Sequence, residues 1–183
     1  MPRNIEIKLR CDELDDVRQR ALAANASDRG LLVQTDTFFR VAVGRLKLRE
    51  INGTSAELIA YSRADVAGSK ASDYVVAPVT EPATMLAALS AACGILRVVR
   101  KRRDLLLWRN VRIHLDRVEG LGNFVELESA VGDVDEATAR LNLDECLNLL
   151  GLASAEVISV AYADLLATTP SPPYSGERAG VRG

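Results

Sequence analysis

The chain has 183 residues, which is long enough for one domain with a sizeable buried core. Its 23 basic and 25 acidic residues give a formal net charge of −2, so a generally basic surface for binding nucleic acid is not indicated. The three cysteines lack Cys-x-x-Cys spacing, which argues against a disulfide framework or a zinc site and favours reduced thiols in a cytoplasmic protein. The chain has no long apolar run and no signal-peptide region, so we expect no contact with a membrane.

Strands are predicted where polar and apolar residues alternate, or where β-branched and aromatic residues gather, because side chains two apart in a strand share a face. The segments of this kind are residues 3–10, 35–41, 45–51, 56–63, 72–77, 97–107, 110–117 and 123–130. Eight strands are enough to close a barrel.

Helical periodicity predicts four helices, at about 12–24, 82–93, 134–150 and 154–167, with Asp12 as the N-cap of the first. The sequence therefore predicts an α+β fold that is rich in β-structure. After about residue 167 the chain becomes rich in Pro, Gly, Ser and Arg, which predicts one domain over residues 1–167 and a disordered tail over 168–183.

Charged side chains recur two residues apart in several of these strands. The segment Arg45-Leu46-Lys47-Leu48-Arg49 places three cations on one face with no counter-ion two residues away. Alternation is also typical of any half-solvated antiparallel strand. Like charges at this spacing, however, are unfavourable unless water or an anionic partner screens them. The same pattern relates Asn4, Glu6 and Lys8; Arg112, His114 and Asp116; and Phe124, Glu126 and Glu128.

A barrel with these ionic faces turned inward would leave its apolar face for the helices to cover. A charged interior is costly when it is dry and unpaired. It becomes favourable when a divalent metal binds the carboxylates and a highly charged anion binds the arginines and lysines. The chain has no GxxxxGK[ST] loop, so side chains rather than a helix N-terminus would hold a phosphate.

The segment Asn4-Ile5-Glu6-Ile7-Lys8 resembles the ExExK signature of the CYTH, or triphosphate tunnel metalloenzyme, superfamily, which includes class IV adenylyl cyclases, thiamine triphosphatases and inorganic triphosphatases. The resemblance spans about residues 3–167, and its further motifs are residues 44–50, 61–65, 101–103, 112–116 and 124–128. Residues 61–65 and 72–74 are most similar to the class IV adenylyl cyclase branch. The resemblance implies a closed eight-stranded antiparallel β-barrel, with helices packed outside and a tunnel that binds a triphosphate with Mg²⁺ or Mn²⁺.

The resemblance also implies a role for each matching residue. Catalytic, metal-binding carboxylates would be Glu6, Asp116, Glu126 and Glu128, with Asn4 as a further metal ligand. Triphosphate-binding cations would be Lys8, Lys47, Arg49, Arg63, Lys101, Arg103 and Arg112.

Two positions leave room for more than one interpretation. Asn4 stands where the signature has its first Glu, so it keeps an oxygen ligand but loses a charge, which should weaken metal binding there or leave it water-mediated. His114 is the only histidine and shares strand parity with Arg112 and Asp116. It is predicted either to line the tunnel mouth, where it could act as a general base, or to be a plain hydrogen-bonded histidine.

Together these features predict an enzyme that processes a triphosphate, namely an adenylyl cyclase that converts ATP to cyclic AMP and pyrophosphate. The enzyme alternative is a triphosphatase that hydrolyses tripolyphosphate, thiamine triphosphate or a nucleoside triphosphate. A third hypothesis is a non-catalytic module that binds polyphosphate or nucleotide, which the loss of the first signature Glu makes plausible. The expected partner is ATP or another triphosphate, not nucleic acid or membrane, and the exposed barrel rim and apolar helices allow a homodimer.

Overall fold

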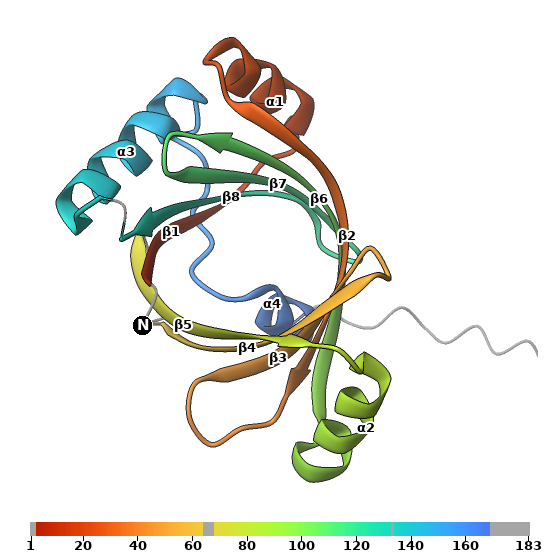
Figure 1. Ribbon diagram of the computed structural model, residues 1–183. Coiled ribbons are helices and arrows are strands. Elements are labelled where there is room, and N and C mark those ends of the chain that lie inside the picture. Colours follow the sequence, from red (N-terminus) through yellow and green to blue (C-terminus); the bar gives the residue numbers. More distant parts are fainter. Residues whose placement is uncertain (1–2, 64–67, 133, 169–183) are drawn as a thin grey trace, which may run out of the picture.

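A computed structural model describes residues 3–63, 68–132 and 134–168. Eight antiparallel strands close into a barrel in the order β1-β5-β4-β3-β2-β6-β7-β8 (Figure 1). This confirms the predicted fold class. The strands are β1 (Arg3–Arg10), β2 (Ser27–Phe39), β3 (Arg45–Ile51), β4 (Ser55–Arg63), β5 (Lys70–Val79), β6 (Ile95–Trp108), β7 (Val111–Val118) and β8 (Gly122–Val131).

The alternation in β1 shows why these strands form a barrel with two different faces. Ile5, Ile7 and Leu9 belong to a buried apolar cluster with residues of the first and third helices. Glu6 and Lys8, one position away from these residues, line the interior of the barrel. Burial of the apolar face under the helices therefore holds the ionic face inward, because a register shift of one residue would exchange the two faces.

The described helices are α1 (Leu14–Ala23), α2 (Pro82–Cys93), α3 (Glu136–Leu149) and α4 (Tyr162–Thr168). α1 and α3 cover the outside of the barrel beside β1, β7 and β8, and α2 packs on its opposite side (Figure 1). Asp12 is not the N-cap of α1, because Glu13 occupies that position and no side chain caps the helix. At α3, Asp135 accepts a hydrogen bond of 2.7 Å from the Thr138 amide, as expected of an N-cap carboxylate.

Two element boundaries differ from the prediction. β2 begins at Ser27, eight residues before the predicted start at 35, because it extends along β6 through a register shift between residues 28 and 31. The predicted helix over 154–167 is wrong for residues 154–161. Val157, Ile158 and Val160 favour an extended chain, and the Ile158 amide donates to the Lys8 carbonyl at 2.8 Å along the part of β1 that β5 does not pair.

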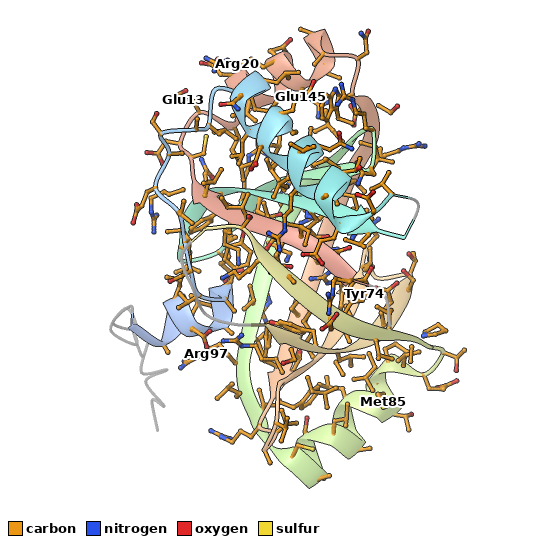
Figure 2. All side chains as sticks on the ribbon, turned by 90° about the vertical axis from the view of Figure 1, so that its left-hand side faces the viewer. Glu13, Arg20, Tyr74, Met85, Arg97 and Glu145 are labelled. Carbon is orange, nitrogen blue, oxygen red and sulfur yellow. The ribbon has the colours of Figure 1, made fainter. Side chains whose placement is uncertain are left out.

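α4 lies at one end of the barrel, whereas the other helices lie around its outside (Figures 1 and 2). The extended segment before it crosses the barrel end, where the Ser159 carbonyl accepts from Lys70 and the Val160 carbonyl accepts from Lys8. Residues 169–183, where the tail was predicted, lie outside the described part of the chain. Cys11, Cys93 and Cys146 are all free thiols. No helix within residues 3–63, 68–132 and 134–168 combines the length and apolar character needed to cross a membrane.

Candidate active site

The barrel interior contains a cavity of about 350 Å³ that residues from all eight strands and from the start of α4 line. It brings together most of the side chains that the sequence marked as functional, namely Asn4, Glu6, Lys8, Lys47, Arg49, Lys101, Arg103, Arg112, Glu126 and Glu128. Asp116 is absent from the described lining and is fully buried. Arg63 ends β4, but its side chain lies outside the described part of the structure.

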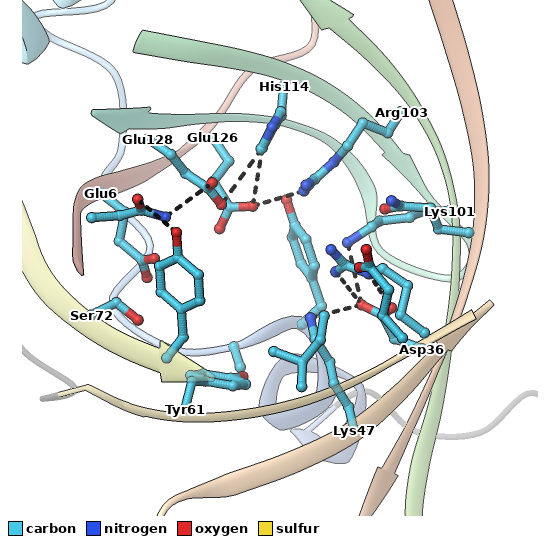
Figure 3. A pocket seen from close by; sticks show the side chains of 18 of the residues that line it. Glu6, Asp36, Lys47, Tyr61, Ser72, Lys101, Arg103, His114, Glu126 and Glu128 are labelled. Carbon is cyan, nitrogen blue, oxygen red and sulfur yellow. Dashed lines mark hydrogen bonds and ion pairs between the residues drawn. The ribbon is translucent and has the colours of Figure 1, made fainter. Parts of the chain in front are cut away.

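One side of the cavity, formed by β1, β7 and β8, holds Glu6, Glu126, Glu128 and His114, which we call the acidic cluster (Figure 3). The strand register places Glu6 directly opposite Glu128, and His114 directly opposite Glu126. Cross-strand partners of this kind have Cβ atoms about 5 Å apart. The clustering therefore follows from the pairing of β8 with a strand on each side.

Among the described residues, Arg112, Lys8 and Arg103 contact the acidic cluster directly. Arg112 Nη2 lies 3.0 Å from Glu128 Oε2, and Lys8 Nζ lies 3.5 Å from Glu126 Oε1. Asn4, the residue that departs from the signature, donates its amide to Glu128 Oε2 at 3.4 Å. Asn4 thus keeps its place beside the carboxylates and contributes a hydrogen bond there.

His114 lies within the acidic cluster, beside Glu126 and Glu128. Its Nδ1 is buried without a hydrogen-bond partner and lies 3.8 Å from Glu126 and 3.7 Å from Glu128. Burial, together with the nearby Arg103 guanidinium, lowers the pKa of His114 and favours the neutral imidazole. A neutral ring nitrogen without a partner beside two carboxylates could serve as a metal ligand, so the structure is compatible with a role for His114 in the site.

Asp116 has a different role from the other predicted carboxylates. Arg103 binds both of its oxygens at 2.6 Å, and the Tyr162 hydroxyl donates to Oδ2 at 2.8 Å. Burial alone would raise the pKa of Asp116, but Arg103 and Lys101 lower it to about 2. Arg103 also donates to Glu126 Oε2 at 2.7 Å, so Asp116 positions a cation that contacts the acidic cluster.

The side of the cavity formed by β2, β3 and β6 holds Asp36, Lys47, Arg49 and Lys101, which we call the cation cluster. Arg49 binds both oxygens of Asp36 at 2.7 Å. Lys47 and Lys101 lie 3.0 and 3.5 Å from Asp36 Oδ2. Asp36, on a neighbouring strand, is therefore the counter-ion of Lys47 and Arg49, whereas Arg45 pairs with Asp164 of α4 at 2.8 Å.

Burial and mutual repulsion change the protonation of the cation cluster. Burial, followed by the Arg49 charge, lowers the pKa of Lys47 to about 8. Burial, followed by the Arg103 charge, lowers the pKa of Lys101 to about 7. Burial alone would raise the pKa of Asp36, but the three cations hold it well below its usual value. The cluster thus holds an ionised carboxylate among lysines that titrate near neutral pH.

Asp36 and Tyr162 lie in the site but were not among the residues predicted from the sequence. Asp36 lies within the predicted strand 35–41, two residues before Phe38, so the two side chains share one face of the strand. Both line the cavity, and this spacing could have indicated an inward-facing carboxylate. Tyr162 had no such signal, because a helix outside the barrel was expected there. Its ring instead lies in the cavity, 4.0 Å from Lys8 Nζ and 5.3 Å from Lys101 Nζ.

The acidic cluster suits a hard divalent cation. Single ligand atoms of His114, Glu126 and Glu128 all lie within 4.8 Å of one another. Carboxylate oxygens are the usual ligands of Mg²⁺, and Mn²⁺ also accepts imidazole. The unpartnered His114 nitrogen is an observation of this structure that fits such an ion.

Comparison with known proteins identifies the family. The model of the CYTH domain family matches residues 2–162. This chain belongs to the CYTH domain family. A protein of Methanocaldococcus jannaschii named as a candidate adenylate cyclase is 32% identical over 68 residues, a match that spans 37% of this chain and 39% of that protein.

Solved structures share the fold of this CYTH domain. The PH1012 protein of Pyrococcus horikoshii is similar with a TM-score of 0.78 and 23% identity, over 88% of this chain and 98% of that one. A candidate adenylyl cyclase of Hippeastrum, described as having a dominant triphosphatase activity, is similar with a TM-score of 0.69 and 16% identity, over 94% and 98% of the two chains. At these identities the likeness to the solved structures shows a shared fold.

Proposed function

We propose that this CYTH domain is a divalent-metal-dependent enzyme that converts ATP to cyclic AMP and pyrophosphate. The observation that carries the proposal is the separation of charge inside one cavity, with the acidic cluster on one side and the cation cluster on the other. The first is suited to a metal ion, and the second to phosphate oxygens.

The charge balance of the cavity supports metal dependence. Among the described side chains, which do not include Arg63, six cations line it: Lys8, Lys47, Arg49, Lys101, Arg103 and Arg112. Five described carboxylates also line it: Glu6, Asp36, Glu57, Glu126 and Glu128. The lining thus has nearly balanced charge by itself, whereas ATP carries about four negative charges at neutral pH. Divalent ions on the acidic cluster would supply the missing positive charge.

The protein groups would act by position and charge. In cyclisation the ribose 3′-hydroxyl attacks the α-phosphorus and pyrophosphate leaves, so the enzyme must align the nucleophile and stabilise the leaving group. Arg49, Lys47 and Lys101 would hold the pyrophosphate part of the substrate. Glu6, Glu126, Glu128 and His114 would hold Mg²⁺ or Mn²⁺, which supplies Lewis-acid polarisation of the phosphate and lowers the pKa of the attacking hydroxyl.

A triphosphatase is the second candidate, and one observation favours it. The Hippeastrum structure that shares this fold comes from a protein described as having a dominant triphosphatase activity. The same cavity could position a water molecule as the nucleophile, and orthophosphate would then be released. Asn4, in place of the first Glu of the signature, also leaves the third hypothesis, binding without turnover, as an outcome to test.

Product analysis distinguishes these candidates. Purified protein is incubated separately with ATP and with inorganic triphosphate, in Mg²⁺ or Mn²⁺, and cyclic AMP, pyrophosphate and orthophosphate are quantified. We expect cyclic AMP and pyrophosphate in equal amounts from ATP, and no product after chelation of the metal. Orthophosphate without cyclic AMP would identify a triphosphatase. Tight binding without any product at saturating metal would identify a binding module.

A further inference from the structure

Among the described side chains, one part of the cavity wall carries no charge. Ile59 and Tyr61 of β4 and Tyr74 and Val76 of β5 face the cavity. The register pairs Ile59 with Val76 and Tyr61 with Tyr74, so the four side chains form a block two strands wide, which we call the uncharged wall. The wall thus consists of two aromatic rings and two aliphatic side chains.

The β4 half of the uncharged wall lies across the cavity from the acidic cluster, whereas on β5 the Tyr74 hydroxyl donates to Asn4 Oδ1 at 3.5 Å. In the closed barrel order, β4 is four strands from β7 in either direction, and Figure 3 shows Tyr61 on the opposite side of the pocket from His114, Glu126 and Glu128. The wall adjoins the cation cluster, because Lys47 pairs with Ile59 and its Nζ lies 5.6 Å from the centre of the Tyr61 ring. A ligand whose phosphates bind the cations would therefore place any attached group near this wall.

The composition of the uncharged wall does not match an inorganic ligand. Val76 lines the cavity and keeps 41% of its surface exposed, so the wall leaves apolar surface open next to the cation cluster. Phosphate oxygens gain nothing from aromatic rings or valine. A planar base or another aromatic group would cover this surface and stack on a tyrosine, as bases do in single-strand binding sites.

An unsatisfied acceptor in the lining points the same way. Gln34 is 3% exposed, and its Oε1 has no hydrogen-bond partner among the described residues. Inorganic triphosphate offers almost exclusively acceptor oxygens at neutral pH, so it is poorly suited to donate to this atom. A hydroxyl or amino group on an organic ligand can.

We infer that the uncharged wall binds the organic, aromatic half of the substrate, so that this site takes a nucleoside triphosphate or a similar aromatic triphosphate in preference to inorganic triphosphate. This inference rests on the proposed function and narrows its substrate class. The cation cluster binds the phosphates, and Tyr61 and Tyr74 bind the group attached to them.

The test compares two ligands that share the phosphate chain. Binding of α,β-methylene-ATP and of inorganic triphosphate is measured by calorimetry, with Ca²⁺ in place of Mg²⁺ to slow turnover. We expect the wild-type protein to bind the ATP analogue more tightly. Tyr61→Ala should weaken binding of the analogue by about 10-fold, as expected for the loss of one stacking ring, and should leave binding of inorganic triphosphate within about 2-fold.

Matched variants separate stacking from packing. Tyr61→Phe keeps the ring and should bind the analogue like the wild type. Val76→Ser makes the wall polar and should weaken only the analogue, whereas Val75→Ser, one residue away on the outer face and 50% exposed, should change neither affinity. The two valine variants keep the test decisive if Tyr61→Ala does not fold.

The outcomes also separate this inference from the proposed function. If both ligands bind and neither Tyr61→Ala nor Val76→Ser changes their ratio, the uncharged wall is not the organic subsite, although the enzyme can still process triphosphates. Equal weakening of both ligands would also overturn the inference, because it would mean that Tyr61 only supports Lys47. If neither ligand binds or is converted, the proposed function and the inference fail together.

Discussion

The two charged clusters of the cavity differ in how their carboxylates are paired. In the cation cluster one carboxylate, Asp36, contacts three cations. In the acidic cluster Glu126 and Glu128 lie beside a neutral histidine and share three cations, Lys8, Arg103 and Arg112. Both clusters are built in the same way, from inward-facing residues of paired strands. The two sides thus differ in their balance of carboxylates and cations. Each side is therefore suited to a different ligand, a metal ion on one and a phosphate chain on the other.

Glu128→Gln should have the largest effect, because it removes a charge from the acidic cluster while keeping the side-chain shape. We expect metal-dependent turnover to fall by about 100-fold or more, and Mn²⁺ binding by the substrate-free protein to weaken. Product formation and a calorimetric Mn²⁺ titration measure the two effects. Glu57→Gln is the control, since Glu57 lines the same cavity beside Arg49. Equal losses in both variants would mean that only the total charge of the cavity matters.

The pH dependence of triphosphate binding should show an intermediate effect from the cation cluster. Burial and neighbouring cations lower the pKa of Lys101 to about 7 and that of Lys47 to about 8, so both lose charge in the free protein between pH 7 and 9. A bound anion raises both pKa values, so binding takes up protons and the affinity falls as the pH rises through this range. We expect about 10-fold weaker binding of inorganic triphosphate at pH 8.5 than at pH 6.5.

Lys101→Arg separates this effect from the titration of the ligand itself. Arginine stays charged throughout the range, so this variant should show a much flatter dependence on pH. Calorimetry at both pH values, in two buffers of different ionisation enthalpy, measures the affinity and the proton uptake. The same pH dependence in the wild type and in Lys101→Arg would show that Lys101 keeps its charge in the free protein.

Asp36→Asn should have the smallest effect on binding, and its direction is informative. Asp36 occupies the donors that phosphate oxygens would use, and it repels them, so its neutralisation should tighten binding of inorganic triphosphate by about 3-fold. The free protein should become less stable by about 3 kcal/mol, because buried cations lose their counter-ion. Thermal unfolding with and without triphosphate should therefore show a larger ligand-induced rise in Tm than in the wild type. Weaker binding would instead mean that Asp36 holds the cations in their binding geometry.

Much of the site could be predicted because it depends on strand parity. Glu6 and Lys8 alternate with Ile5 and Ile7, and this period of two requires them to lie on one face. The predicted cations and carboxylates on β1, β3, β6 and β8 accordingly lie together in the cavity. Parity gives the face of a residue but not its neighbours on other strands. Asp116 therefore came within the predicted set, although Arg103 and Tyr162 occupy its oxygens.

The end of the domain shows where local pattern was insufficient. Residues 154–161 were predicted to be helical, but their backbone groups instead pair with β1 beyond the point where β5 leaves it. That edge exists only once the barrel has closed, so no local property of the segment could reveal it. The same tertiary arrangement brings Tyr162 into the cavity from the end of the barrel.

The sequence by itself determined the strand-rich class and the inward placement of the ionic side chains, because alternation along a strand is a local property of the chain. Its motifs carried the resemblance to the CYTH domain family, which the family match confirms. Only the tertiary structure decided which charges meet. The pairing of Asp36 with Lys47, Arg49 and Lys101, the gathering of His114 with Glu126 and Glu128, and the uncharged wall of β4 and β5 all depend on contacts between side chains of different strands. Electrostatic energy depends on those distances, which the spacing along the chain does not contain.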